Sequence, residues 1–113
     1  VAGVITAFNF PVAPFAWNFC LAIVCGDPVI WKPSEKTPLC ALATAKLFER
    51  AVEKFGDAPA DLLQIALGAG EVGEVLTRSK DVPIISATGS TRCGPLCFRP
   101  SGRVASAARA CAG

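Results

Sequence analysis

The sequence predicts an α/β fold, a partial, doubly wound parallel sheet with flanking helices. Short β-branched or apolar runs alternate with segments of helical periodicity along residues 1–92, and this alternation is typical of right-handed βαβ crossovers. Hydrophobic residues make up 52% of the chain and charged residues 18%, whereas ~25% charged is usual for globular domains. This balance is expected for a sheet that is buried on both faces.

The first elements are strongly apolar. Residues 1–8 form a β-branched run closed by Asn9 and Pro11, which predicts a buried strand that meets a turn. Residues 13–24 are apolar on all sides, so we expect a helix that is buried on more than one side. Residues 28–32 then predict a short second strand.

The next segment gives the clearest helical pattern of the chain. Thr37 is expected to cap the helix, Pro38 suits its first turn, and Gly56 can end it. Apolar positions recur at three- and four-residue intervals and are expected to face the sheet. These positions are Leu39, Leu42, Ala43, Leu47, Ala51 and Phe55. After them, residues 62–67 predict a third strand.

The remaining elements differ in character. Residues 71–78 predict a short helix and residues 82–87 a fourth strand. Residues 93–113 contain no acidic residue, and Pro95 and Pro100 would break a helix there. We therefore expect one domain over residues 1–92 and an irregular tail over residues 93–113. The sequence of this tail is either divergent or translated out of frame.

Composition excludes several classes of function. A net charge of +2 is too small to argue for nucleic acid or a membrane surface. The apolar stretches end well before the ~20 residues that a bilayer span requires. No basic segment precedes an apolar core and a cleavage site at the start. We therefore expect a cytoplasmic protein with no membrane or nucleic-acid partner.

The cysteines predict neither a disulfide framework nor a metal site. Cys20, Cys25 and Cys40 lie in apolar helical patterns, so we expect buried thiols in a reducing compartment. The spacings from Cys20 to Cys25 and from Cys93 to Cys97 do not match usual zinc spacings, and the chain has no His. Cys20, Cys25 and Cys40 lie in apolar contexts that disfavour the reactive thiolate, and the chain has no His to act as a base, so we assign none of them a catalytic role.

Three blocks of sequence, taken in order, resemble a known family. They are residues 5–11 (ITAFNFP), residues 26–38 (GDPVIWKPSEKTP) and residues 87–91 (ATGST). Together they resemble the Rossmann-like cofactor-binding domain of the NAD-dependent aldehyde dehydrogenases, over roughly residues 1–92. The first block is most similar to the branch that oxidises α-aminoadipic semialdehyde.

The resemblance implies that the chain is part of a longer enzyme. The chain starts at Val1 and contains no Met, and the family's nucleophilic cysteine and general-base glutamate have no counterpart in it. The parent is expected to oxidise a small-molecule aldehyde to a carboxylate with NAD and to be a homo-oligomer. This chain alone is expected to be inactive, because it supplies only the dinucleotide platform and one catalytic side chain.

That side chain is Asn9, which the resemblance assigns as the amide donor to a developing oxyanion. Such a donor stabilises the negative charge of a tetrahedral intermediate. From the residues alone, an Asn that caps the following helix is the alternative. By the same resemblance, Thr6, Ala7 and Phe8 line the cofactor near its nicotinamide; taken alone, they are a strand end.

The second block carries Lys32 and Glu35, which the resemblance assigns to the hydroxyls of the adenosine ribose. A carboxylate there can accept both hydroxyl protons and would repel a 2′-phosphate, which favours NAD over NADP. The alternative is a solvated Lys and Glu at the entrance of a helix.

Two glycine-containing loops complete the predicted site. Residues 68–73 have GxGxxG spacing, but no acidic residue follows about 20 positions later as the ordinary fingerprint requires. The resemblance instead assigns Gly73 and Glu74 to the adenosine side of the cofactor, and Gly89 and Ser90 to its phosphates. An ordinary turn is the alternative for the latter pair.

Two other classes of function remain open. The chain is alternatively a noncatalytic nucleotide-binding module or a module for association with a partner. A nucleotide binder has no need of Phe8 and Asn9, and an association module has no need of Lys32, Glu35 and the phosphate loop.

Overall fold

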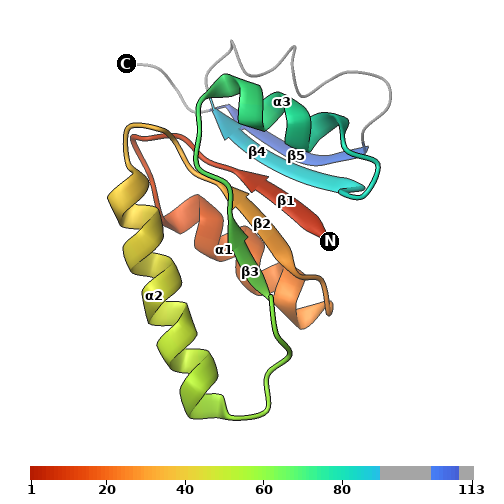
Figure 1. The fold of residues 1–113 in the computed structure, drawn as a ribbon. Helices are drawn as coiled ribbons and strands as arrows, with labels where there is room; N and C mark the ends of the chain where they lie inside the picture. The colour runs from red at the N-terminus through yellow and green to blue at the C-terminus, as the bar shows by residue number, and fades with distance from the viewer. Residues whose placement is uncertain (90–102, 110–113) are drawn as a thin grey trace.

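The computed structural model describes residues 1–89 and 103–109, and these form an α/β fold around one parallel sheet (Figure 1). The strand order is β3-β2-β1-β4-β5, and each neighbouring pair is parallel. The elements are β1 (Ala2–Ile5), α1 (Ala13–Val24), β2 (Val29–Lys32), α2 (Pro38–Phe55), β3 (Leu63–Ile65), α3 (Gly70–Arg78), β4 (Ile84–Gly89) and β5 (Arg103–Arg109). The predicted fold class is confirmed.

One face of the sheet is covered by α1 and α2. Because side chains alternate along a strand, Val4 and Trp31 point to this face, where they meet Phe15 and Phe19 of α1. The ring of Phe15 stacks on the indole of Trp31, with centroids 3.7 Å apart and an interplanar angle of 9°. This aromatic cluster is the larger of the two cores that the described residues form.

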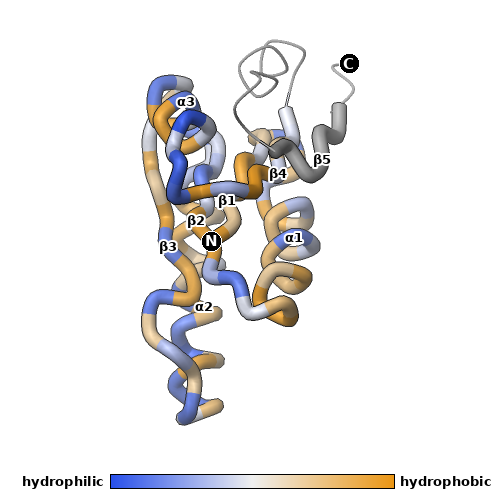
Figure 2. Tube along the Cα trace, turned by 90° about the vertical axis from the view of Figure 1, so that its right-hand side faces the viewer, coloured by the Kyte–Doolittle hydropathy of each residue, from blue (hydrophilic) through white to orange (hydrophobic). Residues whose placement is uncertain are grey.

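The opposite face is covered by α3. Figure 2 shows α1 and α3 on opposite sides of the sheet. Ile5, Ile85 and Leu76 form the core on this side. Gly3 lets α3 approach closely, because a Cβ on it would lie 2.5 Å from Cδ1 of Ile85 and 3.3 Å from Cδ2 of Leu76.

The ends of α2 confirm one prediction and correct another. Gly56 ends the helix in the left-handed region with φ of 79°, where glycine carries no Cβ penalty. Thr37 occupies the N-cap position, but its side chain makes no capping hydrogen bond. Its hydroxyl oxygen is buried without a partner, since the backbone angles there (φ −133°, ψ 44°) lie outside the usual N-cap region.

The predicted apolar face of α2 is wrong. Ala41 is fully buried and Phe48 packs against the same core, so the helix turns this stripe to the sheet, and the small Ala41 side chain suits a close approach. The predicted residues form a second apolar stripe that remains exposed, with Leu39 77%, Leu47 64% and Phe55 75% exposed. Helical periodicity identified the helix but could not choose between two apolar stripes.

The expectation that α1 is buried on more than one side is also wrong. The helix begins and ends as predicted, but its buried residues are Pro14, Phe15 and Phe19, which lie on the face toward the sheet. Trp17 is 62% exposed and Val24 87% exposed.

The predicted buried thiols are a further correction, because Cys20, Cys25 and Cys40 are all exposed. Their apolar surroundings in the sequence belong to helix faces that nothing in the described part of the chain covers. Apolar sequence neighbours therefore did not indicate burial of the thiols.

The strands are shorter or shifted relative to their predictions. The first covers only Ala2–Ile5, and the third only Leu63–Ile65. Within the predicted irregular tail, Arg103–Arg109 forms β5, which pairs with β4. The tail therefore includes regular structure that its sequence did not predict, while the domain boundary at residue 92 stays a prediction.

Candidate functional site

The carboxyl ends of β1, β2 and β4 lie along one edge of the sheet. Ile5 is in register with Lys32 on one side and with Ala87 on the other. The strand order reverses between β1 and β4, because α1 leaves on one face and α3 returns on the other (Figure 1). Ligands of open α/β sheets bind in the crevice at such a point. The predicted site residues at the ends of these three strands are thus brought to one edge.

The loop after β1 is anchored at its start and open at its tip. Thr6 is 4% exposed, and its hydroxyl oxygen accepts a hydrogen bond of 2.9 Å from Nε1 of Trp31. The backbone N–H of Thr6 donates to the carbonyl oxygen of Lys32 at 3.1 Å. Ala7 is half-buried, whereas Phe8 is 53% exposed and Asn9 is exposed.

Asn9 does not cap α1, so the alternative role of a helix cap is not what the structure shows for this residue. The N-cap residue is Val12, three positions later, and α1 has no side-chain cap hydrogen bond. Asn9 lies instead in the turn between β1 and α1, at the carboxyl edge. An exposed amide at this position is accessible to a ligand in the crevice.

The loop after β2 holds a lysine and a glutamate in contact. The side chain of Lys32 is 7% exposed and that of Glu35 52% exposed, and Nζ of Lys32 lies 3.7 Å from Oε2 of Glu35. Lys32 alternates with the buried Trp31 and therefore lies on the α3 face. The alternative of a solvated lysine and glutamate therefore does not describe this pair, because the side chain of Lys32 is buried.

The carboxyl of Glu35 is held ionised by its surroundings. A backbone N–H hydrogen bond is the largest cause that lowers its pKa below the ordinary 4.5, and the positive charges of Lys32 and then Lys36 lower it further, while burial opposes them. Glu35 is therefore a hydrogen-bond acceptor at neutral pH, as a partner of ribose hydroxyls must be.

A contact that sequence reasoning missed joins the two loops. Nζ of Lys36 lies 4.7 Å from the centroid of the Phe8 ring, within the range of a cation–π interaction. No pattern in the sequence relates these residues, because they come from different βαβ crossovers. Their proximity follows only from the parallel pairing of β1 with β2.

Of the two residues predicted in the third loop, only Gly73 lies near the carboxyl edge of the sheet. Gly73 lies in the first turns of α3, and a Cβ on it would lie 3.9 Å from Cδ1 of Ile5, so this glycine faces the end of β1. The carboxylate of Glu74 instead pairs with Arg78 one turn along the helix, at 3.5 Å. Gly73 is thus near the carboxyl edge, whereas Glu74 is engaged within its own helix.

The fourth predicted loop begins at Gly89, the last residue of β4, which is half-buried. Ser90 lies outside the described residues. Gly89 shares the carboxyl edge with Thr6, since Ile5 pairs with Ala87.

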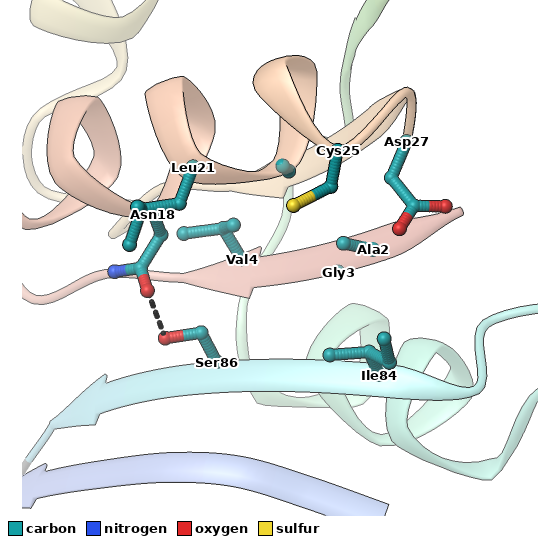
Figure 3. A pocket seen from close by; sticks show the side chains of 10 residues that line it. Ala2, Gly3, Val4, Asn18, Leu21, Cys25, Asp27, Ile84 and Ser86 are labelled. Atoms are coloured by element: carbon teal, nitrogen blue, oxygen red, sulfur yellow. Dashed lines mark hydrogen bonds between the residues drawn. The ribbon is translucent and has the colours of Figure 1, made fainter.

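A cavity of about 230 Å³ lies away from these loops, between α1 and strands β1 and β4 (Figure 3). The Ser86 hydroxyl donates to Oδ1 of Asn18 at 2.9 Å inside it, and Nδ2 of Asn18 donates to the Pro14 carbonyl. No predicted site residue lines this cavity. Ser86 and Asn18 are thus paired, and the Asp27 carboxylate at its rim pairs with the N-terminal ammonium of Val1, so the cavity offers little to orient a ligand.

Two general features concern the described residues as a group. No cluster of three or more His, Cys, Asp or Glu residues among them has the arrangement of a metal site. None of the helices within residues 1–89 combines the length and apolar character needed to cross a bilayer.

The sequence and the fold match one family of enzymes. The family model described as the aldehyde dehydrogenase family matches residues 1–108. The chain therefore belongs to the aldehyde dehydrogenase family. The match extends beyond residue 92, where the sequence resemblance was expected to end.

Curated relatives support the branch indicated by residues 5–11. The chain is 43% identical over 94 residues to aldehyde dehydrogenase family 7 member A1 of Malus domestica, covering 83% of this chain and 18% of the relative. It is 34% identical over 94 residues to the α-aminoadipic semialdehyde dehydrogenase of Bos taurus, covering 83% of this chain and 17% of the relative. The chain thus spans less than a fifth of the length of these relatives.

Solved structures share the fold. The glyceraldehyde-3-phosphate dehydrogenase GapN of Methanocaldococcus jannaschii, complexed with NADP, matches with a TM-score of 0.83 at 34% identity, over 91% of this chain and 23% of that one. An NAD-dependent aldehyde dehydrogenase of Sinorhizobium meliloti matches with a TM-score of 0.74 at 30% identity, over 91% of this chain and 20% of that one.

Proposed function

We propose that this chain is the dinucleotide-binding part of an enzyme that oxidises an aldehyde to a carboxylate with NAD. The observation that carries the proposal is the shared carboxyl edge, where the exposed Asn9 follows β1, the Lys32–Glu35 pair follows the neighbouring β2, and Gly89 ends β4 on the other side of β1. The relatives named for α-aminoadipic semialdehyde make that aldehyde the proposed substrate.

The residues fit a dinucleotide by their chemistry. Glu35 offers an ionised carboxylate and Lys32 an ammonium to the hydroxyls of a ribose. Gly73 and Gly89 present no side chain toward the edge, which lets a ligand approach the backbone closely. When bound, NAD accepts the hydride that leaves the substrate carbon.

Asn9 is the proposed catalytic residue of this chain. A cysteine thiolate elsewhere in the enzyme adds to the aldehyde carbon, and the carbonyl oxygen gains negative charge as the carbon becomes tetrahedral. The side-chain amide of Asn9 donates a hydrogen bond to that oxygen. Loss of hydride then leaves a thioester, which water activated by a glutamate hydrolyses to the carboxylate.

The preference for NAD over NADP belongs to the same proposal. The ionised Glu35 would repel a 2′-phosphate, although Lys32 and Lys36 lie close to it. The matching solved structures include one protein complexed with NADP and one that is NAD-dependent. We expect the Glu35 carboxylate to determine the preference for NAD, because it is the acceptor that both ribose hydroxyls require.

A cytoplasmic location and a homo-oligomeric parent are further parts of the proposal. An association module is the second candidate, because apolar residues of α1 and α2 are exposed, among them Trp17, Leu21, Leu39 and Phe55. In the first reading, the remainder of the enzyme covers these residues. In the second, a partner protein covers them and the carboxyl edge binds no cofactor.

A cofactor titration separates the two readings. Both tryptophans of the chain contact the loop after β1, since Trp31 donates to Thr6 and the ring of Trp17 meets Phe10 at 6.1 Å. Intrinsic fluorescence of the 113-residue chain should therefore change in a saturable manner on addition of NAD, and less readily with NADP. Trp17→Phe isolates the buried Trp31 signal. A chain that is folded by circular dichroism but gives no saturable change would favour the association module.

A further inference from the structure

The contact between Lys36 and Phe8 joins two loops that are each fixed at their base. Thr6 is held by Trp31 and by the Lys32 carbonyl. In the second loop, the buried Ser34 accepts a hydrogen bond from the backbone N–H of Lys36 at its hydroxyl, 3.3 Å away, and Ser34 is 7% exposed.

At the tip of the first loop, Phe8 and Asn9 are both exposed, and the contact of Phe10 with Trp17 lies on the α1 side of them. The exposed fraction of Phe8 is 53%, and the turn that holds Asn9 does not cap α1. The ammonium of Lys36, 4.7 Å from the Phe8 centroid, reaches across from the second loop to this tip. A cation over an aromatic face prefers a narrow range of positions, so the contact restricts the Phe8 ring and the backbone that carries it.

We propose that Lys36 is a positioning residue, which holds Phe8 and with it Asn9 in place against the loop that carries Glu35. The proposal rests on the proposed function for its consequence, because Asn9 is assigned there to the reacting oxygen of the substrate and Glu35 to a ribose of the cofactor. The conformational order of Asn9, the proposed oxyanion donor, would then depend on a side chain of the loop that carries Glu35. The same cation also faces the Glu35 carboxylate, whose pKa it lowers.

The first test needs no cofactor. Backbone ¹⁵N relaxation at Phe8 and Asn9 is measured in the 113-residue chain, in Lys36→Met, Lys36→Arg and Phe8→Leu. Lys36→Met should lower the order parameters at both residues, and Lys36→Arg should retain them because a guanidinium also binds an aromatic face. Adding Phe8→Leu to Lys36→Met should cause no further loss. Unchanged order in Lys36→Met would overturn the proposal.

Lys46→Met is the matched control. Lys46 is exposed on α2 and pairs with Glu49 at 2.6 Å, but it lies over no aromatic ring among the described residues. It should leave the relaxation of Phe8 and Asn9 unchanged. An equal effect of Lys46→Met would indicate a nonspecific response to lost charge and would count against the proposal.

The second test adds NAD. Lys36→Met should weaken the dissociation constant for NAD by about two- to fivefold, the equivalent of an exposed cation–π contact, and should have no such effect in the Phe8→Leu background. If no variant binds NAD but the relaxation differences stand, the proposed function fails and the positioning role stands. If NAD binds and Lys36→Met changes neither readout, the positioning role alone fails.

Discussion

The indole N–H of Trp31 donates a hydrogen bond of 2.9 Å to the hydroxyl oxygen of Thr6, and both residues are buried. This bond joins β2, which ends at the loop that carries Lys32 and Glu35, to the first residue of the loop that carries Asn9. Among the described residues, it and the Ser86–Asn18 bond join side chains that are far apart in the sequence.

Thr6→Val should therefore destabilise the fold. The substitution keeps the shape of the side chain but leaves the indole N–H buried without an acceptor, which costs about 1–3 kcal/mol of unfolding free energy. Urea denaturation measures this loss. Thr44→Val is the control, because the Thr44 hydroxyl donates to the backbone carbonyl oxygen of Cys40 on the exposed surface of α2. Equal losses of unfolding free energy in the two variants would contradict a special role for the Trp31–Thr6 bond.

Two glycines on the α3 side should respond in opposite ways to alanine. A Cβ at Gly3 would overlap Ile85 and press on Val82, and overpacking of this kind costs about 1–3 kcal/mol. A Cβ at Gly73 would meet Ile5 at an ordinary 3.9 Å, and alanine is favoured over glycine within a helix by about 0.5–1 kcal/mol. Thermal unfolding should thus show a lower midpoint for Gly3→Ala and an equal or higher one for Gly73→Ala.

Gly73→Ala then tests the cofactor contact separately from the fold. If Gly73 lies against the cofactor, the variant should bind NAD more weakly although it is at least as stable. Unchanged NAD affinity would remove Gly73 from the binding site.

Glu35→Gln should reduce the preference for NAD over NADP. Two like charges about 4 Å apart repel by about 1–4 kcal/mol near a protein surface, and the half-exposed Glu35 belongs at the lower end, so the ratio of the two dissociation constants should fall by about tenfold. Parallel titrations with NAD and NADP measure it. Glu49→Gln is the control, because Glu49 is an exposed glutamate that also pairs with a lysine three residues away.

The Glu35 carboxyl should titrate below pH 4.5. Its folded-state pKa is lowered, chiefly by a backbone hydrogen bond and then by Lys32 and Lys36. Its contribution to stability is thus present above the ordinary pKa and is lost as pH falls through the folded value. The ¹³C shift of the side-chain carboxyl measures the midpoint, which Lys36→Met should raise and Lys46→Met should not. A midpoint at or above 4.5 in the unmodified chain would contradict the lowering of this pKa by the backbone hydrogen bond and the two lysines.

Asn9→Ala in the complete enzyme should lower turnover on the order of a hundredfold or more, because loss of one oxyanion donor costs about 2.7–4 kcal/mol of barrier. The dissociation constant for NAD should remain near that of the parent. Asn18→Ala is the comparison, since Asn18 bonds Pro14 and Ser86 on the other face; it should affect stability instead of turnover. Near-normal turnover in Asn9→Ala would remove this residue from the mechanism.

Local signals in the sequence predicted the elements and the edge well. Proline at the start of α2 and Gly56 at its end are properties of single residues, so the helix bounds followed directly. The meeting of Asn9, Lys32 and Gly89 at one edge followed from parallel connectivity alone.

Features that depend on tertiary packing could not be predicted in the same way. Leu39 and Ala41 are two residues apart in one helix, yet the smaller one faces the sheet, because the distance between helix and sheet decides which side chain fits. The Lys36–Phe8 contact depends on the register of β1 with β2, which the sequence does not state.

The outer surface of α1 has a practical consequence. This helix contains no charged side chain, and Trp17, Leu21 and Val24 are exposed on it together with the exposed thiols of Cys20 within the helix and Cys25 directly after it. We expect the isolated chain to aggregate as its concentration rises. Air oxidation of the exposed thiols should then convert the reversible aggregates into disulfide-linked ones. Purification under reductant at low protein concentration should yield a monodisperse sample, and light scattering before and after removal of the reductant would follow the change.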